Sequence, residues 1–256
     1  MSGRGFRFSV IAILVAACGG GQVPAPSSNI AATAVAQPSV TTPAPTSTPT
    51  STAAAAAAIH RTNVLVAWQS GDVAEADVVV EVENTGGTWV ELDPGRSDYT
   101  IFNANASVEA KGSFVYAYPK YLGPGQIGYI AVNLTKSGAK ASDLKNLETN
   151  VYFYQVVESD AILLKTGTIT NRKARSEGEG PTTAGTLTNT SSKRVDSAIA
   201  GAFYFDGSGK FLGFSHTSLI ENVEPGQTIG FSTVSGAPHI LLSAIKTTVV
   251  IASPSS

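Results

Sequence analysis

Alternating hydrophobic and polar positions run through the chain after residue 60 and predict short β-strands. In residues 77–83, for example, Val78, Val80 and Val82 share one face of a strand, and two glutamates occupy the other. Several further segments combine β-branched and aromatic residues, which favour strands. They are residues 127–134, 151–157, 202–205, 213–217, 228–234 and 247–251.

Turn-forming residues separate these segments. Asn-Thr-Gly-Gly at 84–87, Gly-Pro-Gly at 123–125, Asp-Gly-Ser-Gly at 206–209 and Pro-Gly at 225–226 combine residues that initiate turns or accept a positive φ. Only residues 141–147 favour a helix, and only briefly. Short strands with turn signals at this spacing are typical of a β-sandwich or barrel, so we predict an all-β fold.

The strand pattern occurs twice. Four segments match later segments in the same order, at offsets near 100 residues, and one pair shares Pro-Gly-Gln. Such a repeat predicts two tandem β-sandwich domains, residues 61–158 and 159–253. The alternatives are one large sandwich and a chance similarity between β-rich sequences. The matching pairs are 80–87 with 185–192, 99–107 with 202–210, 121–132 with 222–233, and 144–155 with 242–253.

The repeated unit resembles the FxLYD-type domain of exported bacterial proteins. The resemblance rests on FYFDGSGK and the later PGQ in the second copy, and on YTIFNANAS and PGQ in the first. The first copy departs from the pattern at Asn103 and Ala106, where the second has Asp206 and Gly209. The resemblance implies two tandem immunoglobulin-like β-sandwiches, and it implies no enzymatic activity.

The start of the chain has the pattern of a secretory signal. Arg4 and Arg7 precede an uncharged apolar run, residues 8–17, which is too short to span a bilayer by itself. A basic start, a short apolar run and small residues at its end predict a signal peptide that ends at residue 17. The sequence Val-Ala-Ala-Cys that ends at Cys18 resembles the lipobox of bacterial lipoproteins, with Val15 where Leu is usual.

The lipobox resemblance implies that Cys18 is the lipid-attachment residue and the N-terminus of the mature chain. We therefore expect an exported lipoprotein whose partner is the membrane, anchored to the outer face of the cell membrane or to an outer membrane. Two or more acyl chains, such as palmitate, are needed for stable anchoring. Cys18 is the only cysteine, so no internal disulfide is expected. The alternative is an ordinary signal peptide with an incidental cysteine.

A segment rich in Pro, Ser, Thr and Ala follows the cysteine. From residue 19 to residue 59 it contains no charged and no aromatic side chain. Such a sequence has too little to bury to offset the entropy of ordering. Residues 18–60 are therefore predicted to be a disordered tether.

Few residues suggest chemistry. His60, His216 and His239 have no metal-ligand spacing, and Ser215 beside His216 lacks the glycine pattern of a nucleophile elbow. Asp206-Gly-Ser-Gly lacks the twelfth-position Glu of a calcium loop and favours a hairpin turn. We therefore predict no catalytic residue, no cofactor and no metal site.

The sequence contains one acidic and one basic cluster. Three carboxylates occur in residues 71–77, where a solvated loop is favoured over a weak calcium site. Two nearby glutamates offset the charge of the basic cluster at 171–175. We predict that residues 171–183 form a loop. Without the signal segment the chain carries 15 basic and 19 acidic residues, so no nucleic-acid partner is expected.

Aromatic residues give the remaining hint about function. Six of them lie at matching places in the two copies and form either an exposed binding strip or, as is more common, core packing. They are Phe114, Tyr116, Tyr118, Tyr121, Phe211 and Phe214.

The combined features predict a non-enzymatic, lipid-anchored surface protein for adhesion, scaffolding or binding of an envelope protein or glycan. The alternative is a ligand-binding accessory lipoprotein of a transporter or enzyme complex, with its pocket between the two copies. A flat face with exposed aromatic residues favours the first hypothesis, and a large concave pocket favours the second.

Overall fold

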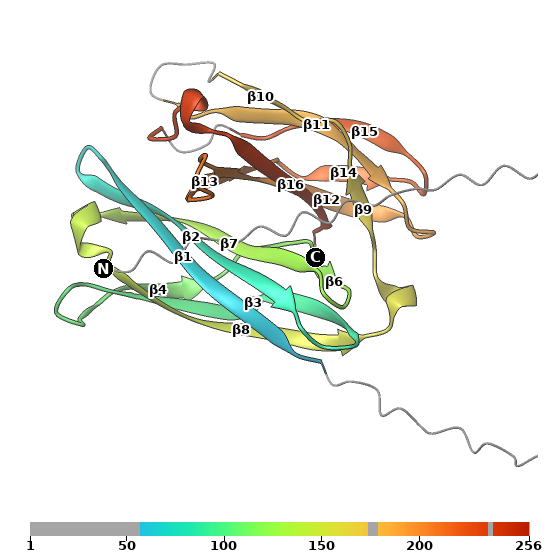
Figure 1. Cartoon of the computed structure of the whole chain (residues 1–256), viewed down its shortest axis with the longest axis horizontal. Helices are drawn as coiled ribbons and strands as arrows, with labels where there is room; N and C mark the ends of the chain where they lie inside the picture. The colour runs from blue at the N-terminus through green and yellow to red at the C-terminus, as the bar shows by residue number, and fades with distance from the viewer. Residues whose placement is uncertain (1–56, 174–178, 235–237, 256) are drawn as a thin grey trace, which may run out of the picture. The chain divides into compact units, whose positions relative to one another are not determined.

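The alternating positions form antiparallel β-strands in the computed structural model (Figure 1), which describes residues 57–173, 179–234 and 238–255. Within these residues the strands form four four-stranded sheets, two from residues 57–158 and two from the residues after 158. We call these two parts of the chain the first half and the second half. The all-β prediction is confirmed, and the fold has the character of an immunoglobulin-like β-sandwich.

The first half contains two sheets. The first has the order β1 (Ile59–Ser70), β2 (Val73–Asn84), β7 (Ile127–Ser137) and β5 (Tyr116–Tyr118). In the second, β3 (Trp89–Phe102) pairs with β4 (Val108–Ser113), β6 (Tyr121–Leu122) and β8 (Asn146–Val156).

The second half repeats most of these pairings, but its described strands include no counterpart of β5, and β9 and β10 together take the place of β1. In one sheet β11 (Thr182–Asn189) pairs with β9 (Leu164–Thr166), β10 (Thr170–Arg172) and β15 (Thr228–Ser232). In the other, β12 (Val195–Phe205) pairs with β13 (Phe211–His216), β14 (Ile220–Val223) and β16 (Thr247–Pro254). Three 3₁₀ turns complete the described elements: η1 (Ala141–Asp143), η2 (Glu158–Asp160) and η3 (Leu242–Ala244).

The two halves share individual hydrogen bonds at positions that the sequence match pairs. The side-chain amide of Asn84 donates to the carbonyl oxygens of Thr88, at 2.8 Å, and Leu122, at 2.9 Å. Asn189, its match in the second half, donates to the corresponding carbonyls of Lys193 and Val223 at 2.8 and 3.0 Å. Each asparagine is fully buried, so the same polar anchor stabilises the end of β2 and of β11.

The fourth sequence match is shifted by three residues. The N–H of Lys145 donates to the carbonyl of Phe102, and the N–H of Lys246 donates to that of Phe205. The structure thus pairs Lys145 with Lys246, whereas the sequence match pairs Lys145 with Ser243. The sequence match failed here because runs of strand-forming residues resemble one another in several registers.

Each half contains an apolar cluster of its own. In the first half Val78, Leu92 and Ile130 belong to a cluster drawn from both sheets, as the valine alternation in β2 predicts. In the second half Leu187 and Val223 belong to another.

A third apolar cluster draws residues from both halves. Tyr129 on β7 stacks on Phe203 of β12 with ring centroids 4.3 Å apart, and Val79 and Phe214 join them. The separate domains at residues 61–158 and 159–253 stay a prediction.

Several details differ from the sequence prediction. Strand β1 begins at Ile59, so the last two residues assigned to the tether belong to the sheet. Residues 141–147 form only the short turn η1 before β8 begins at Asn146. The predicted signal peptide, Cys18 and the tether up to residue 56 lie outside the described residues.

Candidate functional site

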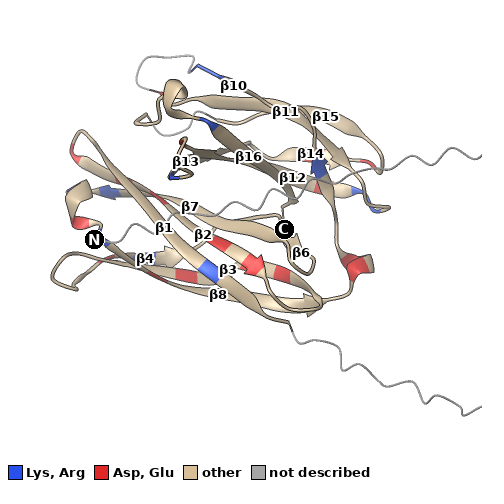
Figure 2. Cartoon of the chain, in the orientation of Figure 1, with Lys and Arg blue, Asp and Glu red and all other residues tan. Residues whose placement is uncertain are grey.

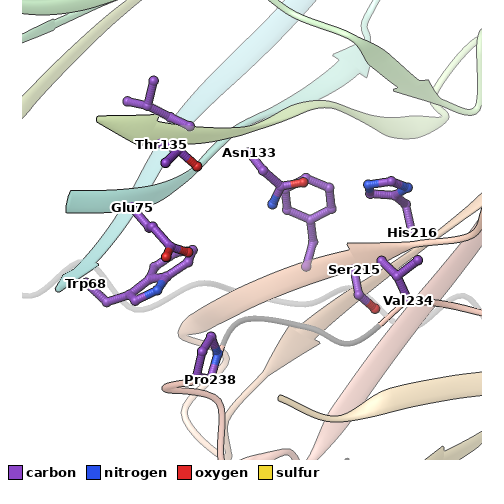
Figure 3. A pocket seen from close by; sticks show the side chains of 10 residues that line it. Trp68, Glu75, Asn133, Thr135, Ser215, His216, Val234 and Pro238 are labelled. Carbon is purple, nitrogen blue, oxygen red and sulfur yellow. The ribbon is translucent and has the colours of Figure 1, made fainter. Parts of the chain in front are cut away.

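A small pocket lies where strands of the two halves meet (Figure 3). Trp68 of β1, Glu75 of β2 and Asn133 of β7 line one side. Phe214 and His216 of β13 line the other. The pocket has a volume of about 180 Å³ and is half open to solvent.

A buried carboxyl group lies beside this pocket. Asp77 of β2 is fully buried, and its Oδ1 accepts a hydrogen bond of 2.7 Å from the side-chain amide of Asn133. Its Oδ2 accepts a hydrogen bond of 3.0 Å from the backbone N–H of Phe214. Burial raises the pKa of Asp77 to about 7, although both hydrogen bonds oppose the shift.

The glycine before Phe214 makes this contact possible. Gly213 has a φ of 148°, a conformation that side chains rarely adopt. A Cβ atom at this position would lie 2.7 Å from Oδ2 of Asp77 and 2.6 Å from Cδ1 of Ile240. The carboxyl group can therefore approach the backbone of β13 only because residue 213 has no side chain.

Two of the three histidines lie beside this pocket, because His216 lines it and His239 packs on Trp68. The ring of His216 packs 4.6 Å from that of Tyr116, and its Nδ1 lies 2.9 Å from the carbonyl of Thr217. The ring of His239 packs 4.5 Å from that of Trp68, and burial lowers the pKa of His239. His60 is exposed on β1. Among the described residues no group of three potential metal ligands occurs.

Ser215 belongs to a buried hydroxyl cluster. Its Oγ lies 2.7 Å from the hydroxyl of Tyr204 and donates to Oγ1 of Thr233 at 3.0 Å. His216, the next residue, packs instead on Tyr116 of the first half. Side chains of adjacent strand residues point to opposite faces, as the sequence predicts, so serine and histidine do not form a catalytic pair.

The two segments considered for calcium have structural roles. Asp206 closes the β12–β13 turn, where Oδ1 accepts from the N–H groups of Ser208, at 2.8 Å, and Lys210, at 2.9 Å. The hydroxyl of Ser208, which donates to the same oxygen at 2.7 Å, lowers the pKa of Asp206 most, and the N–H of Lys210 adds to this effect. The prediction of a loop at residues 71–77 is wrong, because β2 begins at Val73 and carries Glu75 and Asp77.

The predicted loop at residues 171–183 is also partly strand. Asn171 belongs to β10 and β11 begins at Thr182, while residues 174–178 lie outside the described part of the chain. The side chain of Asn171 donates to Thr248 at 2.7 Å and accepts from Thr183 at 2.8 Å. Strand pairing therefore places Arg172 on β10, where its side chain is exposed.

The aromatic residues proposed as a binding strip are mostly core residues. Phe114, Tyr118, Phe211 and Phe214 are buried. The exposed-strip interpretation of these residues is therefore wrong, and the core interpretation is correct. Phe114 belongs to the first half's own core, whereas Tyr118, Phe211 and Phe214 belong to the cluster around Phe203 that both halves share.

A different pair of aromatic side chains is exposed. Tyr152 and Tyr154 of β8 retain 49% and 43% of their accessible surface. They lie opposite Asp93 and Glu91 of β3, on the face of this sheet that points away from the first-half core. We use the name tyrosine platform for this surface, which consists of Asp93, Arg96, Asp98, Asn150, Tyr152 and Tyr154.

Polar contacts hold the tyrosine platform together. The guanidinium of Arg96 lies 5.9 Å from the ring centre of Tyr152 and 6.0 Å from that of Tyr154. It also donates to the hydroxyl of Tyr154, which in turn bonds Oδ2 of Asp93 at 3.1 Å. The side-chain amide of Asn150 donates to Asp98 at 3.0 Å. The rings are thus held in place before any partner binds.

An insertion in β3 places Arg96 on this surface. Asp93 pairs with Tyr152 and Asp98 pairs with Asn150, so residues 94–97 together face a single residue of β8. Ser97 anchors the insertion, because its hydroxyl donates to the carbonyl of Asp93 at 2.6 Å and accepts from the N–H of Tyr152 at 3.0 Å. Such bulges redirect side chains next to functional sites.

The sequence contained a signal for this surface that the prediction did not use. Residues 151–155, Val-Tyr-Phe-Tyr-Gln, were assigned to a strand only on their composition. Their alternation already places Val151 and Phe153 on one face and both tyrosines on the other. The insertion at 94–97 carried no comparable signal.

Comparisons with models of known protein families and with curated proteins find no match for this chain. Of the helices in the described residues, none is long and apolar enough to cross a membrane.

Proposed function

We propose that this chain is a non-enzymatic, lipid-anchored binding protein of the bacterial cell envelope. In this proposal two FxLYD-type immunoglobulin-like modules stand on a disordered tether, and the tyrosine platform contacts the partner. The exposure of Tyr152 and Tyr154 carries the proposal. Tyrosine and arginine supply most of the affinity at many binding surfaces, because they combine large contact areas with polar tips.

Binding rather than catalysis is supported by what the reactive groups do. The hydroxyl of Ser215 forms hydrogen bonds with Tyr204 and Thr233 within a buried cluster. The carboxyl group of Asp77 accepts hydrogen bonds from Asn133 and from the backbone of Phe214. These groups stabilise the fold, so they support the proposal that the chain is not an enzyme.

The size of the pocket at Trp68 favours this function over that of a ligand-binding accessory protein. Its volume of about 180 Å³ is below the ~300–1,000 Å³ that is usual for small-molecule sites. The exposed aromatic face is preorganised by the contacts of Arg96 with both tyrosines. We therefore place the binding function on the tyrosine platform.

The lipobox sequence supports the anchor. Cys18 follows two alanines at the end of an apolar run, and lipidation there gives the chain at least two acyl chains. Each buried CH₂ contributes about 0.8 kcal/mol, so two chains hold the protein stably on a membrane. The tether then lets the folded residues extend away from the lipid surface.

Substitution of Cys18 tests the anchor. We expect Cys18→Ala to abolish incorporation of radiolabelled palmitate and to move the protein from the membrane fraction to the soluble exported fraction. Ser27→Ala, in the tether, is the matched control and should leave labelling and fractionation unchanged. Continued labelling of the alanine variant would contradict the proposal.

A further inference from the structure

Equivalent sheet faces of the two halves differ in exposure. In the second half, Ile199 and Phe203 on β12 are buried against the first half. The repeat matches Phe203 with Thr100 of β3, on the face that carries Asp93 and Asp98. The first half thus has polar and tyrosine side chains on a surface whose counterpart is an apolar contact.

The insertion that positions Arg96 occurs in the first half only. Strand β12 pairs with β16 in one unbroken register from Ala198 to Phe205, whereas β3 has three more residues than β8 between the Asp93 and Asp98 pairs. The repeat therefore differs at the point where the tyrosine platform is built. A difference of this kind at one copy indicates a binding role specific to that copy.

The platform combines ring faces with planar polar groups. Tyr152 and Tyr154 are two positions apart on β8, so their rings repeat every ~7 Å along the strand. Asn150 and Asp98 continue this row towards a shallow polar hollow lined by Arg61 and Asn63. A sugar ring has an apolar C–H face that packs on an aromatic ring, and hydroxyl groups around its edge that bond such carboxylate, amide and guanidinium groups.

The local charge selects against polyanions. Within the platform the two negative charges of Asp93 and Asp98 outnumber the single positive charge of Arg96. Residues 57–158 carry twelve acidic and seven basic side chains, and Figure 2 shows acidic positions on the strands of the first half. Nucleic acids and anionic wall polymers would be repelled by this surface.

We infer that the tyrosine platform binds a neutral polysaccharide strand of the cell envelope, with sugar rings on Tyr152 and Tyr154. This inference rests on the proposed binding function and names its ligand class. A glycan is favoured over a protein partner because polar groups alternate with the rings across the face. Protein interfaces instead have an apolar centre with a polar rim.

Affinity electrophoresis tests the inference. The full-length chain, purified in detergent, is run through gels containing neutral polysaccharides (hydroxyethyl cellulose, glycol chitin or mannan) and, separately, the polyanions alginate and heparin. At least one neutral polysaccharide is expected to retard the chain, and the polyanions are not. Tyr152→Ala and Tyr154→Ala should each weaken the retardation by about tenfold, as loss of a central aromatic contact does.

Matched variants separate the role of the rings from general effects. Tyr152→Phe keeps the ring and should retain binding, whereas Leu219→Ala removes an exposed apolar side chain of the second half and should change nothing. The inference is overturned if no neutral polysaccharide retards the chain, if only the polyanions do, or if the two tyrosine-to-alanine variants bind like the unmodified chain. If the chain is retarded only when an envelope protein is added, the surface binds a protein partner, and the inference is also overturned.

The anchor and the glycan site can fail separately. The Cys18→Ala chain is expected to bind the same polysaccharide as the unmodified chain, because the platform lies on the folded residues. Glycan binding with failed palmitate labelling would contradict the lipid anchor alone. Palmitate labelling without glycan binding would contradict the ligand class alone.

Discussion

The backbone N–H of Phe214 donates a hydrogen bond of 3.0 Å to Oδ2 of Asp77, a residue 137 positions earlier in the chain. This bond joins β13 of the second half to β2 of the first, beside the aromatic cluster around Phe203. A buried carboxyl group is costly unless its oxygens are paired, and both oxygens of Asp77 accept hydrogen bonds. The contact between the halves is therefore specific in geometry as well as apolar.

The first prediction concerns the pH dependence of stability. Burial raises the pKa of Asp77 from 3.8 to about 7, so the folded chain holds a proton that the unfolded chain releases. The resulting stability is fully present below about pH 4 and is lost as the pH rises through about 7, with a magnitude of up to ~4 kcal/mol. Asp77→Asn should remove this dependence, as measured by urea unfolding across that range.

A nearby carboxyl group supplies the control for Asp77. Asp72 is exposed in the turn between β1 and β2, so Asp72→Asn should leave the pH profile of the unfolding free energy unchanged. If Asp77→Asn shows the same decline in stability between pH 4 and pH 7 as the unmodified chain, Asp77 is not its source.

The second prediction concerns the repeated asparagines. Asn84→Ala and Asn189→Ala each leave one buried and one part-buried carbonyl group without a donor. We expect each variant to lower the free energy of unfolding by about 2–4 kcal/mol, by similar amounts because their contacts match. Asn105→Ala, in an exposed turn, should change stability by less than about 0.5 kcal/mol. A large effect at only one of the two buried positions would show that the repeat is not energetically equivalent.

The third prediction concerns the contact between the halves. Phe203 is fully buried and packs on Tyr129 and Tyr118 of the first half. Phe203→Ala should cost about 3–5 kcal/mol, the usual result of removing a buried phenyl ring. Hydrogen exchange should become faster in β2 and β7 as well as in β12, because the lost contacts belong to both halves.

Phe231 provides the comparison for Phe203. It is buried within the apolar cluster of the second half, so Phe231→Ala should accelerate exchange in β11 and β15 and leave β2 unchanged. If hydrogen exchange in the Phe203→Ala variant becomes faster only after residue 158, the halves are not coupled through this ring.

Much of the fold could be predicted because strands and turns depend on local patterns. The alternation of Val78, Val80 and Val82 predicts which face of β2 is buried, and Asn-Thr followed by Pro-Gly-Gln marks the repeat. Strand β1 was missed because its side chains are mostly half-buried, so its alternation is weak. The registers of β8 and β16 differ from the sequence match because strand-forming runs have little positional identity.

The candidate site was less predictable because it depends on contacts between distant segments. The burial of Tyr118 follows from packing against residues beyond 195, which no local pattern indicates. Arg96 reaches the two tyrosines only because residues 94–97 form an insertion, and the opposing strand lies more than 50 residues later. The exposure of Tyr152 could have been derived from alternation alone.

The insertion at residues 94–97 has a consequence for how such a chain can diverge. Its counterpart strand, β12, is buried on both faces, so additional residues there would disrupt packing on either side. The outward face of β3 tolerates changes in length and side chain better, because its side chains are half-buried or exposed. Related proteins are therefore expected to differ in ligand preference mainly through the length and sequence of residues 94–97. The second half is expected to vary less, because it supports the first half.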